Sequence, residues 1–210
     1  MAKKRISDVL IEVLANAGIE RIYGITGDSL NSVNDSLRRN GKIAFEHVRH
    51  EETAAFAAGA EASLTHKLTV CAGSSGPGNL HLINGLFDCH RNRVPVLAIA
   101  SHIPQSEVGL NYFQETHPEN LFKECSCFCE LVSNPKQMPE ILFRAMNAAV
   151  GNQDVAVIVL PGDVAVMEME IDELPVWNPP RLPHIVPQRE DIEEMAAHLE
   201  TGKRITLFCG

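Results

Sequence analysis

The stretch Leu68-Thr69-Val70-Cys71-Ala72-Gly73-Ser74-Ser75-Gly76-Pro77-Gly78-Asn79 runs from an apolar segment through a glycine-rich turn to the start of a helix. A short strand with apolar side chains on both faces is typical of a parallel sheet that helices cover on each side. Glycines directly after such a strand let a ligand approach the backbone closely. The stretch therefore predicts an α/β fold with a ligand site beyond the carboxyl ends of its strands.

The same alternation of helix and strand continues on both sides of this stretch. Apolar residues recur at helical spacing from Ser7 to Ala17, and Gly18 ends that helix. Asp28 or Ser29 is expected to cap the next helix. We predict helices over residues 7–17, 29–39, 51–64, 76–91 and 138–150, and strands over 22–25, 43–47, 68–72, 95–100, 126–132 and 155–160. The expected fold class is α/β, a parallel sheet of about six strands with helices on both faces.

Composition divides the chain into three parts. Residues 1–166 carry the alternating pattern and are predicted to form one domain. Residues 167–188 contain five prolines, which is typical of an extended linker. Residues 189–200 are again helical and residues 204–210 begin an apolar strand, so 189–210 are predicted to be the truncated start of a middle domain. We therefore expect the chain to be a fragment of a longer protein.

Charge and hydropathy argue against several classes of function. The 210 residues carry a formal net charge of −9, and the basic cluster Lys3-Lys4-Arg5 has no counterpart elsewhere in the chain. Because nucleic-acid-binding domains carry a basic patch, no nucleic acid partner is expected. No apolar run approaches the ~20 residues that span a bilayer. Residues 6–14 include Asp8 and Glu12 and do not form the apolar core of a secretory signal. We expect a cytoplasmic protein.

The six cysteines are expected to be free thiols. Three of them, Cys125, Cys127 and Cys129, alternate, so on a strand they would share one face. A metal site there is one interpretation, but the spacing fits no common zinc pattern. Buried small side chains are the favoured interpretation. We predict no metal ligand in this chain.

Glu51 is the strongest catalytic candidate. It follows the predicted strand 43–47 and opens a helix made almost entirely of alanine and other small residues. Such a helix is expected to pack closely on all sides, and a carboxyl group entering it would be desolvated and would hold its proton more tightly. The alternative is a carboxylate that only interacts with the helix dipole. No Gly-x-Ser-x-Gly nucleophile motif competes with Glu51.

Four loops and turns are further candidates, and each also has a structural interpretation. Residues 73–79 lack a GxGxxG pattern, and Pro77 removes an amide donor, so a weakly charged ligand part or a plain turn fits better than a phosphate. Residues 23–29 form a second strand-to-helix turn. Residues 111–117 are either a polar and aromatic binding loop or a local core anchor. Around residues 84–91, the side chains of His81, Asp88 and His90 suggest acid–base or metal chemistry, whereas a surface pair of Asp88 and Arg91 on one helix is the simpler interpretation.

Together these motifs resemble the thiamine-diphosphate-dependent enzymes, in particular their N-terminal, pyrimidine-binding domain. The family signal lies in Arg49-His50-Glu51 with residues 54–59, in Gly76-Pro77-Gly78-Asn79 and in Pro161-Gly162-Asp163-Val164. Residues 26–31, 79–92 and 112–118 are similar to one branch, the quinone-linked pyruvate dehydrogenases or pyruvate oxidases. The resemblance covers about residues 5–210.

The resemblance assigns roles to residues. Glu51 would hydrogen-bond N1′ of the aminopyrimidine ring of thiamine diphosphate and favour the imino tautomer, whose nitrogen removes the C2 proton of the thiazolium. Phe113 and Gln114 match positions in or beside the active site, so the implied catalytic residues are Glu51, Phe113 and Gln114. The residues implied to bind the cofactor are Gly27, Glu51, Ser74, Ser75, Gly76, Pro77, Asn79 and Asn84.

The resemblance also implies an activity and partners. The reaction is the oxidative decarboxylation of pyruvate to acetate and CO2, with electrons passing through FAD to a quinone. In the family, Mg²⁺ and the diphosphate are held by a Gly-Asp-Gly…Asn motif in a separate domain, and FAD mainly by the middle domain. The motif does not occur here, so this fragment is expected to be inactive alone. The implied assembly is a homo-oligomer, a dimer or tetramer, that meets the inner membrane face only through a C-terminal region outside this chain.

Three alternatives remain open from the sequence. The nearest is an acetolactate synthase or another thiamine-diphosphate-dependent 2-oxo acid decarboxylase, which needs the same glutamate. The second is a non-catalytic binding or dimerisation module. The third is a nucleotide-binding α/β domain, which the lack of a phosphate motif disfavours.

Overall fold

The computed structural model describes residues 2–208, and the chain forms two compact units, Met1–Pro180 and Arg181–Gly210. The first unit contains every strand described. Its elements are β1 (Ala2–Arg5), α1 (Ile6–Asn16), β2 (Arg21–Gly24), α2 (Asn31–Asn40), β3 (Ala44–His47), α3 (Glu51–Thr65), β4 (Thr69–Gly73), α4 (Pro77–Arg91), β5 (Val96–His102), α5 (Pro118–Leu121), β6 (Phe128–Leu131), α6 (Met138–Asn152), β7 (Val155–Pro161), α7 (Gly162–Val166) and β8 (Glu168–Ile171). The second unit contains α8 (Arg189–Glu200), on which no side chain is buried.

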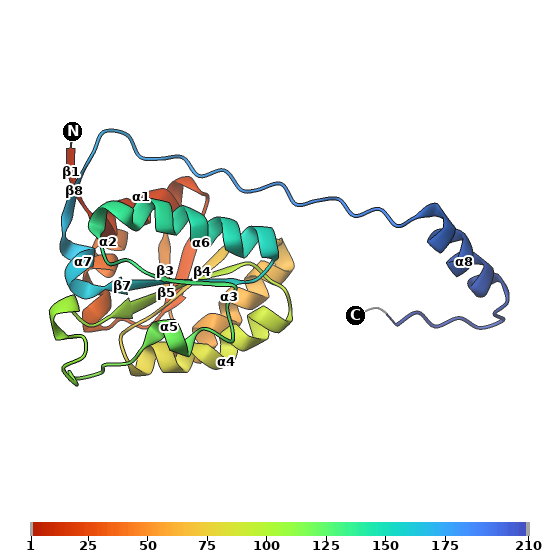
Figure 1. Ribbon diagram of the computed structural model, residues 1–210, viewed down its shortest axis with the longest axis horizontal. Helices are drawn as coiled ribbons and strands as arrows, with labels where there is room; N and C mark the ends of the chain where they lie inside the picture. The colour runs from red at the N-terminus through yellow and green to blue at the C-terminus, as the bar shows by residue number, and fades with distance from the viewer. Residues whose placement is uncertain (1, 209–210) are drawn as a thin grey trace. The chain divides into compact units, whose positions relative to one another are not determined.

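A six-stranded parallel sheet in the order β3-β2-β4-β5-β7-β6 forms the centre of the first unit. Helices α1, α2 and α6 cover one face, and α3, α4 and α5 cover the other (Figure 1). All residues of β4, β5 and β7 are buried. Along β5, Leu97 and Ile99 enter the first core, whereas Val96, Ala98 and Ala100 enter the second. The predicted fold class is confirmed, and the apolar strands are explained by burial on both faces.

Helices α3 and α4 pack against each other through very small residues. A Cβ atom on Gly85 would lie 2.6 Å from Ala55 Cβ and 2.8 Å from the Glu52 carbonyl oxygen. A Cβ on Gly59 would lie 2.6 Å from the Cys89 sulfur. The expectation that this alanine-rich helix packs on all sides is wrong, because Phe56 and Leu64 on its outer face are exposed. The small residues of α3 allow it to pack closely against α4 and the sheet.

A second, two-stranded sheet joins the start of the first unit to a segment near its end. β1 pairs antiparallel with β8, with Lys3 opposite Glu170 and Arg5 opposite Glu168. Opposite charges at facing positions favour this register. The span 167–188, predicted as an extended linker, therefore contains a strand, and within the same span the Trp177 Nε1–H donates to Asn147 Oδ1 at 2.9 Å. The predicted domain boundaries remain predictions.

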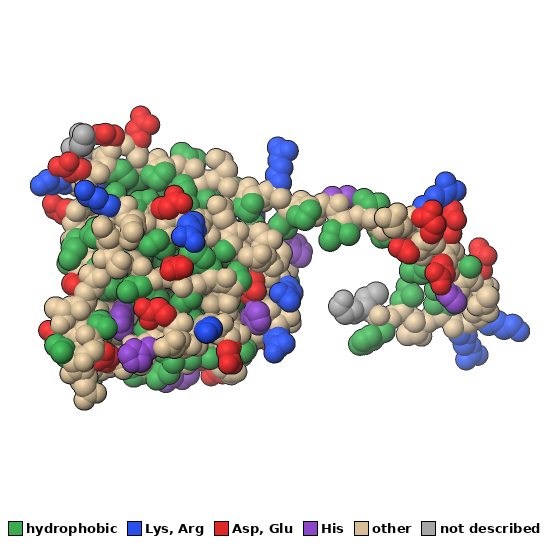
Figure 2. All heavy atoms as spheres, in the orientation of Figure 1, with side chains coloured by type: hydrophobic (Ala, Val, Ile, Leu, Met, Phe, Trp, Pro, Cys, Tyr) green, Lys and Arg blue, Asp and Glu red, His purple; other side chains and the backbone are tan. Residues whose placement is uncertain are grey.

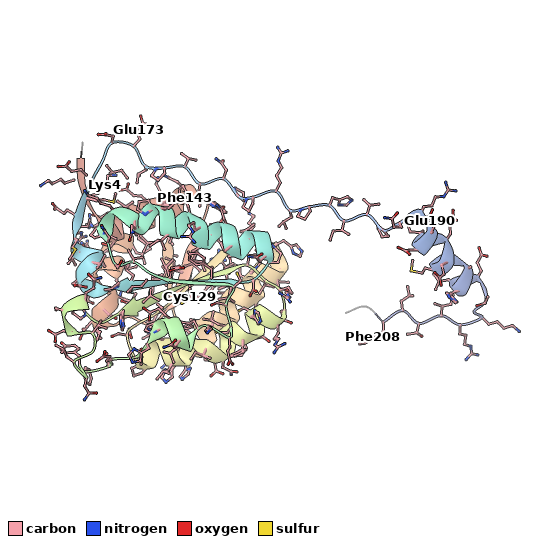
Figure 3. The ribbon with its side chains drawn as sticks, in the orientation of Figure 1. Lys4, Cys129, Phe143, Glu173, Glu190 and Phe208 are labelled. Carbon is pink, nitrogen blue, oxygen red and sulfur yellow. The ribbon has the colours of Figure 1, made fainter. Side chains whose placement is uncertain are left out.

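The cysteine region and the end of the chain differ from the sequence expectations. β6 covers only residues 128–131, so Cys129 lies on the strand (Figure 3) while Cys125 and Cys127 precede it. The three thiols do not share one strand face. Burial raises the pKa of Cys125 to about 11 and that of Cys129 to about 12. No strand forms over residues 204–208, and Cys209 and Gly210 lie outside the described residues.

The surface of the first unit is mixed in charge, and no described helix could span a membrane. On the face seen in Figure 2, acidic and basic side chains are interspersed among hydrophobic ones over the first unit. Over residues 2–208, none of the helices combines the length and the apolar character that a membrane crossing requires.

The α3–α4 contact yields a test with a matched control. Gly85→Ala adds one methyl group where a Cβ meets Ala55 and backbone, so we expect the free energy of unfolding to fall by about 1–3 kcal/mol. Gly151→Ala, in α6, adds the same group where no atom lies within 4 Å, so we expect a gain of roughly 0.5–1 kcal/mol. Urea unfolding of both variants measures the two values. Equal effects at the two glycines would contradict the close helix contact.

Candidate functional site

The candidate site lies where the order of the strands reverses. The chain leaves β2 toward β3 and leaves β4 toward β5, on opposite sides, and ligands in open α/β sheets bind at such a switch point. The loops after these two strands touch, because a Cβ on Gly27 would lie only 2.5 Å from Ser74 Cβ. The backbone N–H of Ser75 donates to Ser29 Oγ at 2.9 Å.

Ser29 therefore has a different role from the one predicted. Neither Asp28 nor Ser29 caps α2; both lie in a short 3₁₀ turn, Asp28–Leu30, and α2 begins after it without a side-chain cap. The Ser29 hydroxyl instead ties the β2 loop to the β4 loop. The sequence pattern at the helix start gave no indication of this bond, because its partner is 46 residues away.

Glu51 is the first residue of α3, which follows β3, and it lies at the same edge of the sheet as these loops. Only 7% of the residue is exposed. Its Oε2 lies 3.0 Å from His81 Nδ1. Its Oε1 faces Gly78, where a Cβ would approach that oxygen to 3.3 Å and Ser74 Oγ to 2.8 Å. Gly78 thus places no side chain between Glu51 Oε1 and the Ser74 hydroxyl, and we call the backbone surface of Gly78 beside this oxygen the notch.

Two histidines flank Glu51. The rings of His50 and His81 are stacked with centroids 4.3 Å apart and an interplanar angle of 25°. His50 caps α3, because its Nδ1 accepts a hydrogen bond from the Glu52 backbone N–H at 3.3 Å. The atoms of His50, Glu51 and His81 lie close enough together to hold a metal ion. In the structure described, the Nδ1 atoms of both histidines already take part in hydrogen bonds.

The glycine-rich loop meets the polar and aromatic loop that the sequence singled out. Gly76 has φ +66°, and a Cβ there would lie 2.7 Å from the Gln114 carbonyl oxygen. The Ser75 hydroxyl donates to Gln114 Oε1 at 3.4 Å, and Gln114 itself has φ +64°. Pro77 opens α4, where its missing N–H leaves no bond unmade. The structure therefore brings together two segments that the sequence analysis treated separately.

Not every predicted residue faces the notch beside Glu51. Asn79 is fully buried and its Nδ2 donates to the Ser101 carbonyl oxygen at 2.8 Å, so it joins α4 to β5. Asn84 donates to Glu52 Oε1 on the outside of the helix pair. Phe113 is 78% exposed. The cofactor and catalytic roles assigned to these residues from the resemblance stay predictions.

A cavity of about 300 Å³ adjoins the site. Its lining includes Ser29, Ser75, Phe113, Gln114 and His102. His102 is 3% exposed and its Nδ1 lacks a hydrogen-bond partner within residues 2–208. Burial, partly opposed by Glu119 and Glu115, lowers the pKa of this imidazole.

Sequence reasoning gave His50 and His102 no role in this site, considered His81 only for acid–base or metal chemistry together with His90, and did not name Gly78 as a cofactor residue. His50 precedes Glu51 directly, whereas His81 follows the Gly-Pro-Gly turn by three residues. The signal in the sequence was that His50 and His81 each stand next to a motif of the predicted site. Their contact depends on the packing of α3 on α4, which no local pattern contains.

The chain is similar to known proteins over its whole length. Residues 4–121 match the family described as thiamine pyrophosphate enzyme, N-terminal TPP binding domain. An uncharacterized 42.6 kDa protein of Pseudomonas amyloderamosa is 58% identical over 100% of this chain and 53% of its own length. A pyruvate oxidase of Lactiplantibacillus plantarum is 37% identical over 74% of this chain and 26% of its own length. An acetolactate synthase of Arthrospira platensis is 34% identical over 83% of this chain and 31% of its own length. The chain thus spans about half the length of these relatives or less.

His102 predicts an acid-sensitive contribution to stability. Because burial lowers the pKa of His102 in the folded state, the unfolded chain binds this proton more readily once the pH falls below the ordinary value of about 6.5. The contribution is complete above pH 6.5 and is lost progressively below it. In His102→Asn, which cannot titrate, we expect a smaller loss of unfolding free energy between pH 7.5 and pH 5.5 than in the parent chain. Urea unfolding at both pH values measures the difference, and equal losses would refute it.

Proposed function

The chain belongs to the thiamine pyrophosphate enzymes through their N-terminal TPP-binding domain, and we propose that it supplies the pyrimidine half of the active site of a pyruvate oxidase or dehydrogenase. The observation that carries this proposal is the nearly buried carboxyl group of Glu51, with one oxygen facing the notch at Gly78.

The residues around the notch fit an aminopyrimidine ring. Within residues 2–208, Glu51 Oε1 makes no hydrogen bond, so it is free to share a proton with a ring nitrogen. The notch is bordered by Ser74 and by the carboxyl group of Glu51, and a carboxylate suits a flat ring that shares a proton better than it suits a phosphate. Glu51, Ser74, Ser75, Gly76 and Gly78 would hold this part of thiamine diphosphate.

Bound thiamine diphosphate would supply the electron sink for decarboxylation of a 2-oxo acid. Glu51 would hold and move the proton at N1′ of the ring, which is general acid–base chemistry by a carboxyl group placed away from water. The contact between Gly76 and Gln114 would keep the polar loop close to the reacting end of the site. Phe113, exposed beside Gln114, would help to cover the bound substrate.

The substrate and further partners form the finer part of the proposal. We propose pyruvate as the substrate, with FAD and then a quinone as electron acceptors, on the similarity to a pyruvate oxidase. Mg²⁺ and FAD would be held mainly by parts of the enzyme outside this chain. The exposed apolar side chains Phe56 and Leu80 on α3 and α4 support a homo-oligomer. We propose a cytoplasmic enzyme that reaches the membrane surface only through a region outside this chain.

A second candidate is an acetolactate synthase. The similarity to the Arthrospira platensis protein favours it, and it requires the same carboxyl group. The product distinguishes the two reactions, since an oxidase releases acetate and reduces an acceptor, whereas a synthase forms a new carbon–carbon bond and releases acetolactate.

The role of Glu51 is tested in the enzyme loaded with thiamine diphosphate. We expect Glu51→Gln to lower pyruvate decarboxylation by about 10²–10⁴-fold, because the amide cannot exchange a proton at N1′. Glu61→Gln, on the same helix, removes one negative charge beside Arg21 and is the control that should retain activity. Release of ¹⁴CO2 from labelled pyruvate measures both. Near-normal turnover by Glu51→Gln, or equal loss in both variants, would refute the assignment.

A further inference from the structure

We propose that His81 is the positioning residue of Glu51. Its Nδ1–H holds Oε2, and this contact makes Oε1 the oxygen that faces the notch at Gly78. The inference deepens the proposed function and rests on it for the identity of the ring that Oε1 would meet. The contact itself is a property of this chain.

The direction of this hydrogen bond depends on the charge of Glu51, and the proposal takes Glu51 as ionised. An ionised carboxylate can only accept, so the Nδ1 atom of His81, 3.0 Å from Oε2, would then carry the proton. A hydrogen bond to an ionised acceptor is stronger than one between neutral groups. A neutral His81 is therefore held in its Nδ1–H tautomer, which leaves Nε2 as the unprotonated nitrogen.

The first backbone N–H groups of α3 donate to acceptors other than the Glu51 carboxyl group. The Glu52 N–H donates to His50 Nδ1, and the N–H groups of Thr53 and Ala54 donate to the His50 carbonyl oxygen. The amides that often bind an acidic side chain at a helix start are thus already occupied. Within the described part of the chain, His81 is the one hydrogen-bond partner of the Glu51 side chain.

His50 fixes the ring of His81 from the other side. The side chain of His81 is 44% exposed, so without support it could turn toward solvent. The stacked ring of His50 limits this motion, and His50 is itself fixed by its cap bond to Glu52. His81 of α4 thus contacts the carboxyl group, His50 at the cap of α3 supports the His81 ring, and both contacts depend on the close approach of these helices.

Holding one oxygen is useful because only one orientation suits proton exchange. A carboxyl group with a free side-chain torsion divides its time among several orientations, and a displacement of about 1 Å at a reacting group can cost about 10²-fold in rate. His81 would act through Glu51 without touching the cofactor.

The tautomer of His81 is the first test, and it needs no cofactor. Long-range ¹H–¹⁵N spectra of the 210-residue chain at pH 8 distinguish a protonated Nδ1 from a protonated Nε2. We expect His81 to show Nδ1–H in the parent chain and in Glu52→Ala, and to change to Nε2–H in Glu51→Ala. An Nε2–H tautomer in the parent chain would overturn the proposal. So would a His81 signal that changes when chelator is added, since the cluster would then hold a metal ion.

Two substitutions with similar side chains provide the second test. In His81→Asn the amide nitrogen takes the place of Nδ1 and can still donate to Oε2, whereas in His81→Gln it takes the place of Nε2 and cannot. In the enzyme loaded with thiamine diphosphate, we expect the exchange of the C2 proton with deuterium to slow by about 10–100-fold in His81→Gln, with the affinity for thiamine diphosphate almost unchanged. His81→Asn should remain within about threefold of the parent, by the same argument that it preserves the orientation.

The controls separate this inference from the proposed function. His50→Asn keeps a good helix cap but removes the stacked ring, so an intermediate exchange rate is expected. Equal slowing in His81→Asn and His81→Gln would refute positioning by Nδ1. If the proposed function is wrong, Glu51→Gln remains active while the Nδ1–H tautomer persists; if only this inference is wrong, Glu51→Gln is inactive and the tautomer is Nε2–H.

Discussion

The close contact between α3 and α4 is the constraint on which the site depends. Gly59 and Gly85 leave no room for a Cβ at this contact, and the other buried residues on the α3 side of this core are alanines. The short distance between the helix axes brings the first turn of α3 against the first turns of α4. Glu51 thereby meets both Gly78 and His81, although it is separated from them by about 30 residues of sequence.

The sheet supplies the second requirement, a place where loops converge. Because the strand order reverses between β2 and β4, the loops that carry Gly27, Ser29 and Ser75 meet at one edge. Glycines remove side chains where these loops touch, and the Ser29–Ser75 hydrogen bond joins them. The two loops and the α3–α4 contact therefore border the site, and the polar loop at Phe113 and Gln114 forms its more exposed side.

Much of this arrangement could be predicted from the sequence, because its signals are local. Apolar runs of strand length and glycines after them indicated a parallel sheet and its ligand edge. The position of Glu51, between a strand and a helix of small residues, indicated a shielded carboxyl group. The errors arose where the role of a residue depends on contacts far away in the sequence. Ser29 has the chemistry of a helix cap but bonds another loop, and Cys127 lies outside the strand that was expected to contain it.

Periodicity and composition act over a few residues, so they were enough to predict the α/β class, the order of the main helices and strands, and Glu51 as the leading candidate. Long-range packing instead sets which oxygen of Glu51 faces the notch, the contact of His81 with the other oxygen, the stacking of His50 on His81 and the burial of Asn79. These features depend on distances between helices that are set by packing of side chains far apart in sequence. A pattern along one chain segment cannot contain such distances, because they result from the shapes of two surfaces together.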